Sequence, residues 1–411
     1  MTSTPPSSAP APAGPAPVAA TPAAPAPATS TWRRGLARLA GGPGRLTGLD
    51  VARGLAVLGM FVAHLYTPDP VTGADPMSWS WVFDGRSSIL FATLAGVSLA
   101  IMSGRTRPLE GVPALQARMR ILVRALLIFT LGEILTMLGT PVAIILQAYA
   151  VLFVLALPFL RWSARRLFVL AAASAVVMPV LTPLVASTLA WAQLGSVPLT
   201  GLLVTGMYPG MIWFTFIVLG LAIGRCQLSG TDVKLRLVAV GAAVSTLAYS
   251  IAAIADGAPP TDPMGGGSMV TEGRPAFVLP DLAALARTAE PHSGGVAEVV
   301  GSGAFAMAVI GLCLLAVQGG RWLRALLTPI AAVGSMALTA YTIHIVALWR
   351  VGDAYWQETG LQLLVPFVEV TLIGCTLWRF FLGRGPLERL LTWVSWKAAG
   401  VTPAARGRAA T

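Results

Sequence analysis

Apolar runs of about 20 residues follow one another along most of this chain, and they constrain its fold more than any other feature. They extend from about residue 51 to residue 382. A run of ~20 apolar residues is long enough for a helix to cross the hydrocarbon core of a bilayer. Charged residues make up only 11% of the chain, which leaves such helices no polar face for water. We therefore predict an all-α, polytopic membrane protein with one helical bundle.

Composition divides the chain into four segments. Residues 1–30 are almost entirely Ala, Pro, Ser and Thr. This composition predicts a disordered tail with polyproline II character, and no charged segment precedes an apolar core as in a signal peptide. Residues 31–49 are a basic amphipathic lead-in that we expect to lie along the inner membrane surface. Residues 50–382 form the bundle, and residues 383–411 form a basic cytoplasmic tail.

About ten segments are apolar enough to be transmembrane helices, with ends placed to within ~2–4 residues. They are 50–66, 85–103, 120–138, 141–160, 167–190, 207–224, 236–255, 297–317, 325–349 and 361–382, and the sixth has an alternative start near Pro198. Residues 256–296 are rich in Pro and Gly, which predicts an external loop. Within that loop, "PDLAALARTAE" predicts a short amphipathic helix.

The positions of the positive charges predict the orientation of the bundle. If the N-terminus is inside, the inner loops and the C-terminal tail contain most of the unpaired cations: Arg105, Arg107, Arg118, Arg120, Arg161, Arg165, Arg166, Arg225, Lys234, Arg236, Arg321, Arg324, Arg384, Arg389, Lys397, Arg406 and Arg408. Cytoplasmic loops of membrane proteins carry such an excess of Lys and Arg. We therefore place both termini in the cytoplasm. The same distribution explains the net charge of +11 and argues against a nucleic-acid partner.

The first predicted span, "GLDVARGLAVLGMFVAHLY", carries polar side chains where they are costly. Arg53 and His64 are eleven residues apart, so they lie within about 20° of one helix face and ~16 Å apart along the axis. Asp50 precedes Arg53 by one turn, which predicts an i,i+3 ion pair. Two interpretations stay open. Arg53 and His64 are either interfacial anchors, or they line an inward-facing stripe that serves transport or catalysis.

Further polar side chains lie within or beside the predicted spans. Tyr341 precedes His344 by one turn and shares its face. With His64 and His292, all three histidines of the chain fall on the predicted outer side, where a neutral imidazole is suited to moving protons. Four other residues are candidates either for a binding site or for contacts between helices: Asp84, Arg86, Glu133 and Gln147. No spacing typical of a metal site or of a phosphate-binding loop occurs.

Two segments, "RLTGLDVARGLAVLGMFVAHL" and "WSWVFDGRSSILFATLAGVSLAI", resemble the opening of the transmembrane acyltransferase superfamily. The similarity covers roughly residues 45–395. It includes the heparan-alpha-glucosaminide N-acetyltransferase-like bacterial proteins and the related YeiB-like membrane proteins, whose function is largely unassigned. The later segments "ILQAYAVLF", "GSMALTAYTIHIVAL" and "GRGPLERLLTWVS" are similar to signatures of these groups. Related enzymes that O-acetylate surface polysaccharides carry an Arg and a His with the spacing of Arg53 and His64.

The resemblance implies a membrane acyltransferase of the bacterial plasma membrane. It would move an acetyl or other acyl group from cytosolic acyl-CoA, a co-substrate, to a hydroxyl or amine of an envelope glycan or small molecule. Its catalytic residues would be His64, Arg53, His344 and Asp50. Acyl-CoA would be bound by Arg53, Arg118, Arg120 and Arg124. The acceptor would be bound by Asp84, Arg86, Tyr341, His292, Gln147 and Glu133.

One departure from the family pattern bears on this mechanism. The heparan-type enzymes use a His in the loop after the first helix, and the corresponding stretch here, "TPDPVTGADPMSWSW", contains none. His64 or His344 would have to take that role. The alternatives are a proton-coupled exporter or a non-catalytic membrane protein of the same superfamily. The expected partners are the lipid bilayer, acyl-CoA and the acceptor, and a homodimer stays open.

Overall fold

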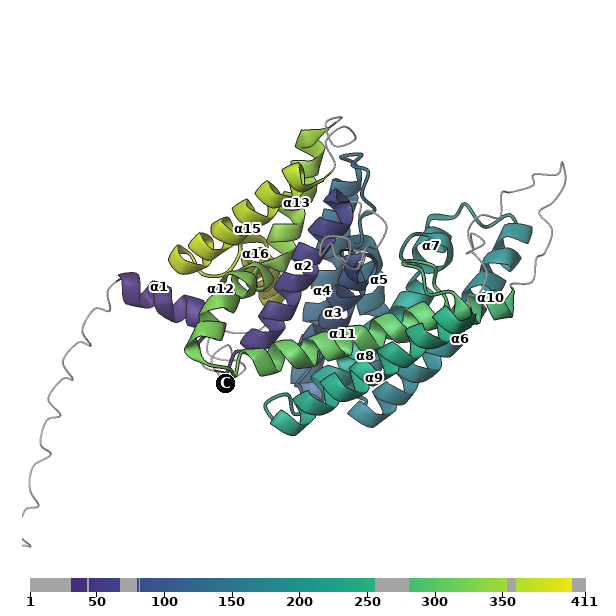
Figure 1. Cartoon of the computed structure of the whole chain (residues 1–411), viewed down its shortest axis with the longest axis horizontal. Coiled ribbons are helices and arrows are strands. Elements are labelled where there is room, and N and C mark those ends of the chain that lie inside the picture. The colour runs from purple at the N-terminus through teal and green to yellow at the C-terminus, as the bar shows by residue number, and fades with distance from the viewer. Residues whose placement is uncertain are drawn as a thin grey trace, which may run out of the picture.

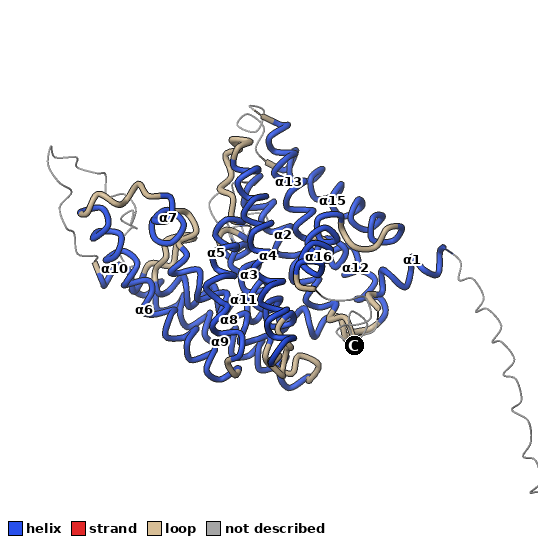
Figure 2. The backbone as a smooth tube through the Cα atoms, turned by 180° about the vertical axis from the view of Figure 1, so that it is seen from behind, coloured by secondary structure: helices blue, strands red, loops and turns tan. Residues whose placement is uncertain are grey.

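The computed structural model describes residues 31–42, 44–66, 80, 82–255, 281–352 and 360–400. Across these ranges every regular element is a helix, and none is a strand (Figures 1 and 2). The predicted tail 1–30, most of the predicted loop 256–296 and residues 401–411 lie outside the described residues. Within that loop, α10 (Leu282–Arg287) occupies the predicted short helix.

Five helices are long and apolar enough to cross a membrane: α2 (Thr47–Leu65), α6 (Ala164–Trp191), α9 (Thr231–Ala255), α11 (Val296–Ala316) and α15 (Leu361–Phe381). Two bent pairs raise the number to seven. In one, the segment Pro198–Thr205, comprising α7 (Pro198–Thr200) and η3 (Gly201–Thr205), precedes α8 (Gly210–Gly224) at 59°. In the other, α12 (Arg321–Ser335) precedes α13 (Ala337–Val351) at 75°. The chain is a multi-pass membrane protein by these criteria.

Each of the ten predicted spans contains a helix, but three of these helices do not qualify as spans. The apolar helices α3 (Arg86–Met102) and α5 (Leu146–Ala156), the latter continued by η2 (Leu157–Arg161), are short. α4 (Gly111–Thr136) is long enough but carries several charged side chains. The count of ten and the side of the membrane on which the termini lie therefore stay predictions.

The helices differ in how much of their surface the bundle covers. The bundle buries 67% of the apolar window of α2 and 61% of that of α11, but only 22% of that of α9 and 11% of that of α15. In Figures 1 and 2, α2 stands between the group formed by α6, α8, α9 and α11 and the group formed by α12, α13, α15 and α16 (Pro386–Ala398). The exposed apolar faces of α9 and α15 are the surfaces suited to contact lipid.

Glycines allow two central helix pairs to approach closely. A Cβ atom at Gly220 of α8 would lie 1.8 Å from the carbonyl oxygen of Thr93 on α3. A Cβ atom at Gly334 of α12 would lie 1.7 Å from the carbonyl oxygen of Asp50 on α2. Small residues at such crossings let helix backbones pack directly in membranes. The second crossing fixes α12 beside the charged end of α2.

The predicted single helix over 325–349 is wrong, because the chain breaks at Met336 between α12 and α13. A break leaves backbone donors and acceptors without intrahelical partners. Glu388 of α16 accepts hydrogen bonds from the backbone N–H groups of Leu338 (2.9 Å) and Thr339 (3.1 Å). Arg379 of α15 donates to the carbonyl of Ala331 (2.8 Å). The anion lies at the N-terminus of α13 and the cation near the C-terminus of α12, as the helix dipoles favour.

We expect Gly220→Ala to lower the free energy of unfolding by about 1–3 kcal/mol, because the added methyl group overpacks the crossing of α3 and α8. Gly374→Ala on α15 is the matched control, because no atom lies within 4 Å of the position of its Cβ. The control should be neutral or slightly stabilising, since Ala favours helix over Gly. Thermal unfolding of the detergent-solubilised variants measures both effects. Equal stability of the two variants would contradict the close crossing.

Candidate functional site

Two cavities that have charged or titratable side chains in their linings lie at the two ends of α2. The larger one, which we call the arginine cavity, has a volume of about 340 Å³. Its polar lining includes four arginines and one carboxylate: Arg45, Arg53, Arg124, Arg384 and Glu388. The two oxygens of Glu388 already accept hydrogen bonds at the start of α13, from two backbone N–H groups and from the hydroxyl of Thr339 (2.6 Å). The cavity therefore has an excess of positive charge, which suits phosphate or carboxylate groups.

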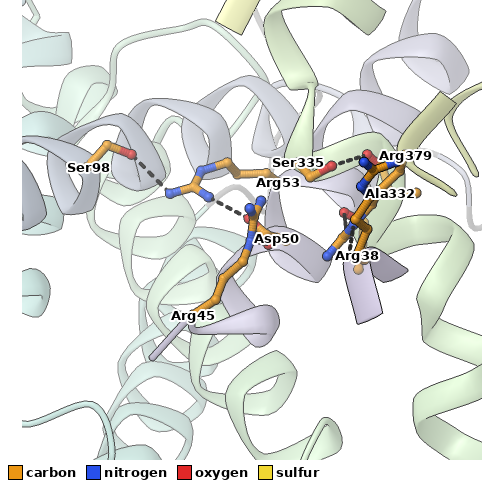
Figure 3. A network of polar contacts seen from close by, with 9 residues as sticks. Arg38, Arg45, Asp50, Arg53, Ser98, Ala332, Ser335 and Arg379 are labelled. Atoms are coloured by element: carbon orange, nitrogen blue, oxygen red, sulfur yellow. Dashed lines mark hydrogen bonds and ion pairs between the residues drawn. The ribbon is translucent and has the colours of Figure 1, made fainter. Parts of the chain in front are cut away.

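Asp50 orients the arginines at this end of α2 (Figure 3). Arg53 Nη1 lies 3.0 Å from Asp50 Oδ1, which confirms the predicted i,i+3 ion pair. Arg45 Nε lies 2.5 Å from Asp50 Oδ2, and Arg53 Nη2 donates to the hydroxyl of Ser98 on α3 (3.0 Å). The carboxylate of Asp50 is buried under these guanidinium groups. Asp50 itself is not in the lining of the cavity, and it positions Arg45 and Arg53, which are.

Of the arginines predicted to bind acyl-CoA, the structure brings Arg53 and Arg124 to the arginine cavity and leaves two others outside its lining. The guanidinium of Arg120 packs 4.2 Å from the ring centre of Trp396, and Arg118 is half-exposed on α4. Sequence reasoning missed Arg45, Arg384 and Glu388 as site residues. The last two fall in "GRGPLERLLTWVS", and its similarity to the family was the one available signal.

The smaller cavity, which we call the histidine pocket, lies at the other end of α2 and has a volume of about 70 Å³. Its polar lining includes His64, Asp84, Tyr208, His292 and Tyr341. Three of the predicted acceptor-binding residues therefore meet here beside the predicted base. They come from α2, the turn before α3, the loop before α11, and α13.

The ring of His344 packs against the ring of His64. The two imidazoles are stacked with their centroids 5.2 Å apart and their planes 7° apart. His344 also stacks on Phe61, one turn earlier on α2, at 4.3 Å. These ring contacts show that α13 packs against α2 at this end. Both ring nitrogens of His344 are buried and have no hydrogen-bond partner within the described part of the chain.

A carboxylate that sequence reasoning missed holds His292 in place. Glu298, in the first turn of α11, accepts hydrogen bonds from the backbone N–H groups of His292 (2.6 Å) and Gly294 (2.7 Å). A Glu at this position that reaches back to the preceding residues is typical of a helix N-terminal box. The ring of His292 packs against Tyr208 at 5.8 Å and Trp213 at 6.4 Å. Burial lowers the pKa of His292, and the opposing effect of nearby Asp84 is smaller, so a neutral imidazole faces the pocket.

One hydrogen bond connects the linings of the two cavities. Tyr149 of α5 lines the arginine cavity, and its hydroxyl donates to the carbonyl of Ser88 on α3 (3.1 Å). Ser88 in turn lines the histidine pocket. The side chain of Tyr149 is buried, so it forms part of the layer of side chains between the two spaces.

Of the three remaining predicted acceptor-binding residues, two make contacts between helices and one is exposed. Gln147 donates to the hydroxyl of Thr136 (2.7 Å) and joins α5 to α4. Arg86 donates to the hydroxyl of Tyr249 on α9 (3.0 Å). Glu133 is exposed on α4 and is in the lining of neither cavity. Within the described ranges, no three His, Cys, Asp or Glu side chains gather in a way that could hold a metal ion.

We expect Asp50→Asn to lower the free energy of unfolding by roughly 2–4 kcal/mol, because it leaves two guanidinium groups without their buried counter-charge. This loss is smaller than that expected for a fully buried ion pair, because both arginine side chains reach solvent. Asp50→Asn combined with Arg53→Met should cost less than the sum of the single changes. Unfolding of all three variants in detergent closes this cycle, and additive losses would argue that the pair contributes nothing.

Comparison with known families covers most of the bundle. The family model described as "Heparan-alpha-glucosaminide N-acetyltransferase, catalytic" matches residues 45–251, just over half of the chain. The model described as "Protein of unknown function (DUF418)" matches residues 276–398. No curated protein matches the chain. The first region carries Arg53 and His64, and the second carries His344. The resemblance seen in the sequence is confirmed, and the chain belongs to the heparan-alpha-glucosaminide N-acetyltransferase catalytic family, with a DUF418 region as its C-terminal part.

Proposed function

We propose that this protein is a membrane acyltransferase that takes an acyl group from acyl-CoA and transfers it to a hydroxyl or amine. The observation that carries the proposal is the pair of cavities on α2, one lined by arginines and one by imidazoles, separated by the layer that contains Tyr149. The family description names an N-acetyltransferase, which favours acetyl as the acyl group.

The arginine cavity is the donor end in this proposal. The phosphates of CoA carry several negative charges, and guanidinium groups bind phosphate through paired, charge-assisted hydrogen bonds. Arg53 and Arg124 face the cavity from α2 and α4, and Arg45 and Arg384 add positive charge. The walls also contain Phe91 and many aliphatic side chains, which suit the uncharged arm that carries the thioester. A cavity of about 340 Å³ takes only a part of acyl-CoA, so the nucleotide would stay at the mouth.

The histidine pocket is the acceptor end. His64 would take the proton from the acceptor hydroxyl or amine as that atom attacks the thioester carbonyl carbon. The new C–O or C–N bond forms, the C–S bond breaks, and the proton passes to the leaving thiolate. His344 holds the ring of His64 by stacking, while Tyr341 and His292 line the space where an acceptor would bind. Asp50 would act indirectly, by orienting Arg53, and Glu298 would act by holding the loop that carries His292.

The axial distance between the two ends sets a requirement on the donor. Arg53 and His64 are separated by eleven residues of α2, about 16 Å at the rise of an α-helix. The extended arm of acyl-CoA would have to pass the layer of Tyr149 and Ser88 to bring its thioester to His64. With the predicted orientation, the donor end opens to the cytosol of a bacterium and the acceptor end faces the envelope. This polarity favours an envelope glycan or a small molecule as the acceptor.

We expect His64→Ala to slow acyl transfer by about 10²- to 10⁴-fold, because the acceptor loses its general base. The assay adds labelled acetyl-CoA to the outside of inside-out membrane vesicles that have been loaded with a glucosamine-terminated oligosaccharide, and it follows both labelled product and released thiol. Thermal unfolding shows whether the variant still folds. Unchanged transfer by a folded His64→Ala protein removes His64 from the mechanism. If the wild-type protein moves unmodified solute and labels no acceptor, the protein is an exporter.

We expect Arg53→Gln to weaken the binding of acetyl-CoA at least tenfold, the effect of losing one charge-assisted contact of about 1.5–3 kcal/mol. Arg166→Gln is the matched control, because this arginine is exposed at the start of α6 and does not line the arginine cavity. Calorimetric titration in detergent measures both dissociation constants. Equal affinities of the two variants would contradict the donor site.

A further inference from the structure

A third cavity, of about 800 Å³, is not used by the proposed reaction. We call it the α1 cavity, because the amphipathic helix α1 (Thr31–Ala40) forms one of its walls through Leu36, Leu39 and Ala40. The other walls come from the start of α2, the start of α9, the end of α11, and α12. Arg45 lines both this cavity and the arginine cavity.

The lining of the α1 cavity combines long aliphatic walls with positive charge. The aliphatic part includes Leu36, Leu39, Leu46, Leu228, Leu314 and Leu327. The cations are Arg45, Lys234, Arg321 and Arg324, and among the described residues that line the cavity there is no carboxylate. Such a lining favours a molecule with an anionic group and an apolar chain.

Lys234 is the most informative of these cations. It is only 4% exposed, and its ammonium group donates to a neutral partner, the carbonyl of Ser229 (3.1 Å). A buried charge is costly unless an opposite charge compensates it. The described lining supplies no such charge, so an anionic ligand beside Lys234 would remove this cost.

The structure also places tryptophans around the α1 cavity. Gly35 of α1 packs against the ring of Phe380, and Trp32 lies edge-on to the same ring at 5.0 Å, so α1 is fixed to α15. On α12, Trp322 is 78% exposed and lies next to Arg321, which lines the cavity. Tryptophan is enriched at the boundary between lipid and water. The cavity therefore lies where a lipid headgroup region is expected.

We propose that the α1 cavity binds an anionic phospholipid. Its phosphate lies among Lys234, Arg321 and Arg324, and one acyl chain follows the leucine-lined wall. A nucleotide fits less well, because no aromatic ring occurs among the described residues of the lining, and a base would have nothing to stack on. This inference does not rest on the proposed acyl transfer, since only Arg45 is shared between the two sites.

The test compares two lipids of identical acyl chains, phosphatidylglycerol and phosphatidylcholine, added to the full-length protein in mild detergent. We expect phosphatidylglycerol to raise the Tm and phosphatidylcholine to raise it much less, because a ligand that binds only the native state stabilises it. We expect Arg321→Gln/Arg324→Gln to weaken phosphatidylglycerol binding at least tenfold. The matched control is Arg165→Gln/Arg166→Gln, two exposed arginines at the start of α6 that do not line the α1 cavity.

Four results would contradict a site for an anionic phospholipid. Equal effects of the two lipids, or equal losses in both double variants, would show that no headgroup site exists. Stabilisation by glycerol phosphate that matches that of the lipid would assign the cations to a soluble anion. Displacement of bound phosphatidylglycerol by CoA would assign the cavity to the donor. Lys234→Met is a second test in case the arginine variant misfolds. It removes one buried charge, so it should keep or raise the Tm without lipid and should lose the increase that phosphatidylglycerol causes.

Discussion

The ion pairs of Asp50 with Arg45 and Arg53 are the interaction on which the arginine cavity depends. Asp50 is also the residue whose backbone carbonyl touches α12, at Gly334. A carboxylate buried at this crossing is tolerated only if an opposite charge compensates it. Arg45 and Arg53 supply that charge, and both line the arginine cavity. Asp50 therefore takes part both in the packing of α2 against α12 and in the orientation of Arg53.

The site could be predicted from the sequence as far as its geometry is local. The pair of Asp50 with Arg53, and the shared face of Arg53 and His64, follow from the period of a helix. The positions of the helices follow from apolar composition. The break at Met336 does not, because the side chains that stabilise its two ends belong to α15 and α16, roughly fifty residues later in the chain. Arg384 joined the cavity for the same reason, since tertiary packing brought it there.

Polar residues inside the predicted spans were a weaker guide to function. Gln147 and Arg86 are buried and bonded, as the functional interpretation required, but their partners are side chains of neighbouring helices. Glu133 faces outward. A polar group in a membrane helix must find a partner, and another helix serves as well as a substrate. The sequence alone does not separate these two cases, because the difference lies in which helix is the neighbour.

The two regions matched by separate family models build each cavity together. Arg53 lines the arginine cavity together with Arg384 and Glu388, and His64 lines the histidine pocket together with His292 and Tyr341. Neither region encloses either space by itself. A chain that had only one of the two regions would lack part of the lining of each cavity. We therefore expect lining residues of the first region to covary with lining residues of the second. The part described as of unknown function therefore supplies the second half of the walls of a single core.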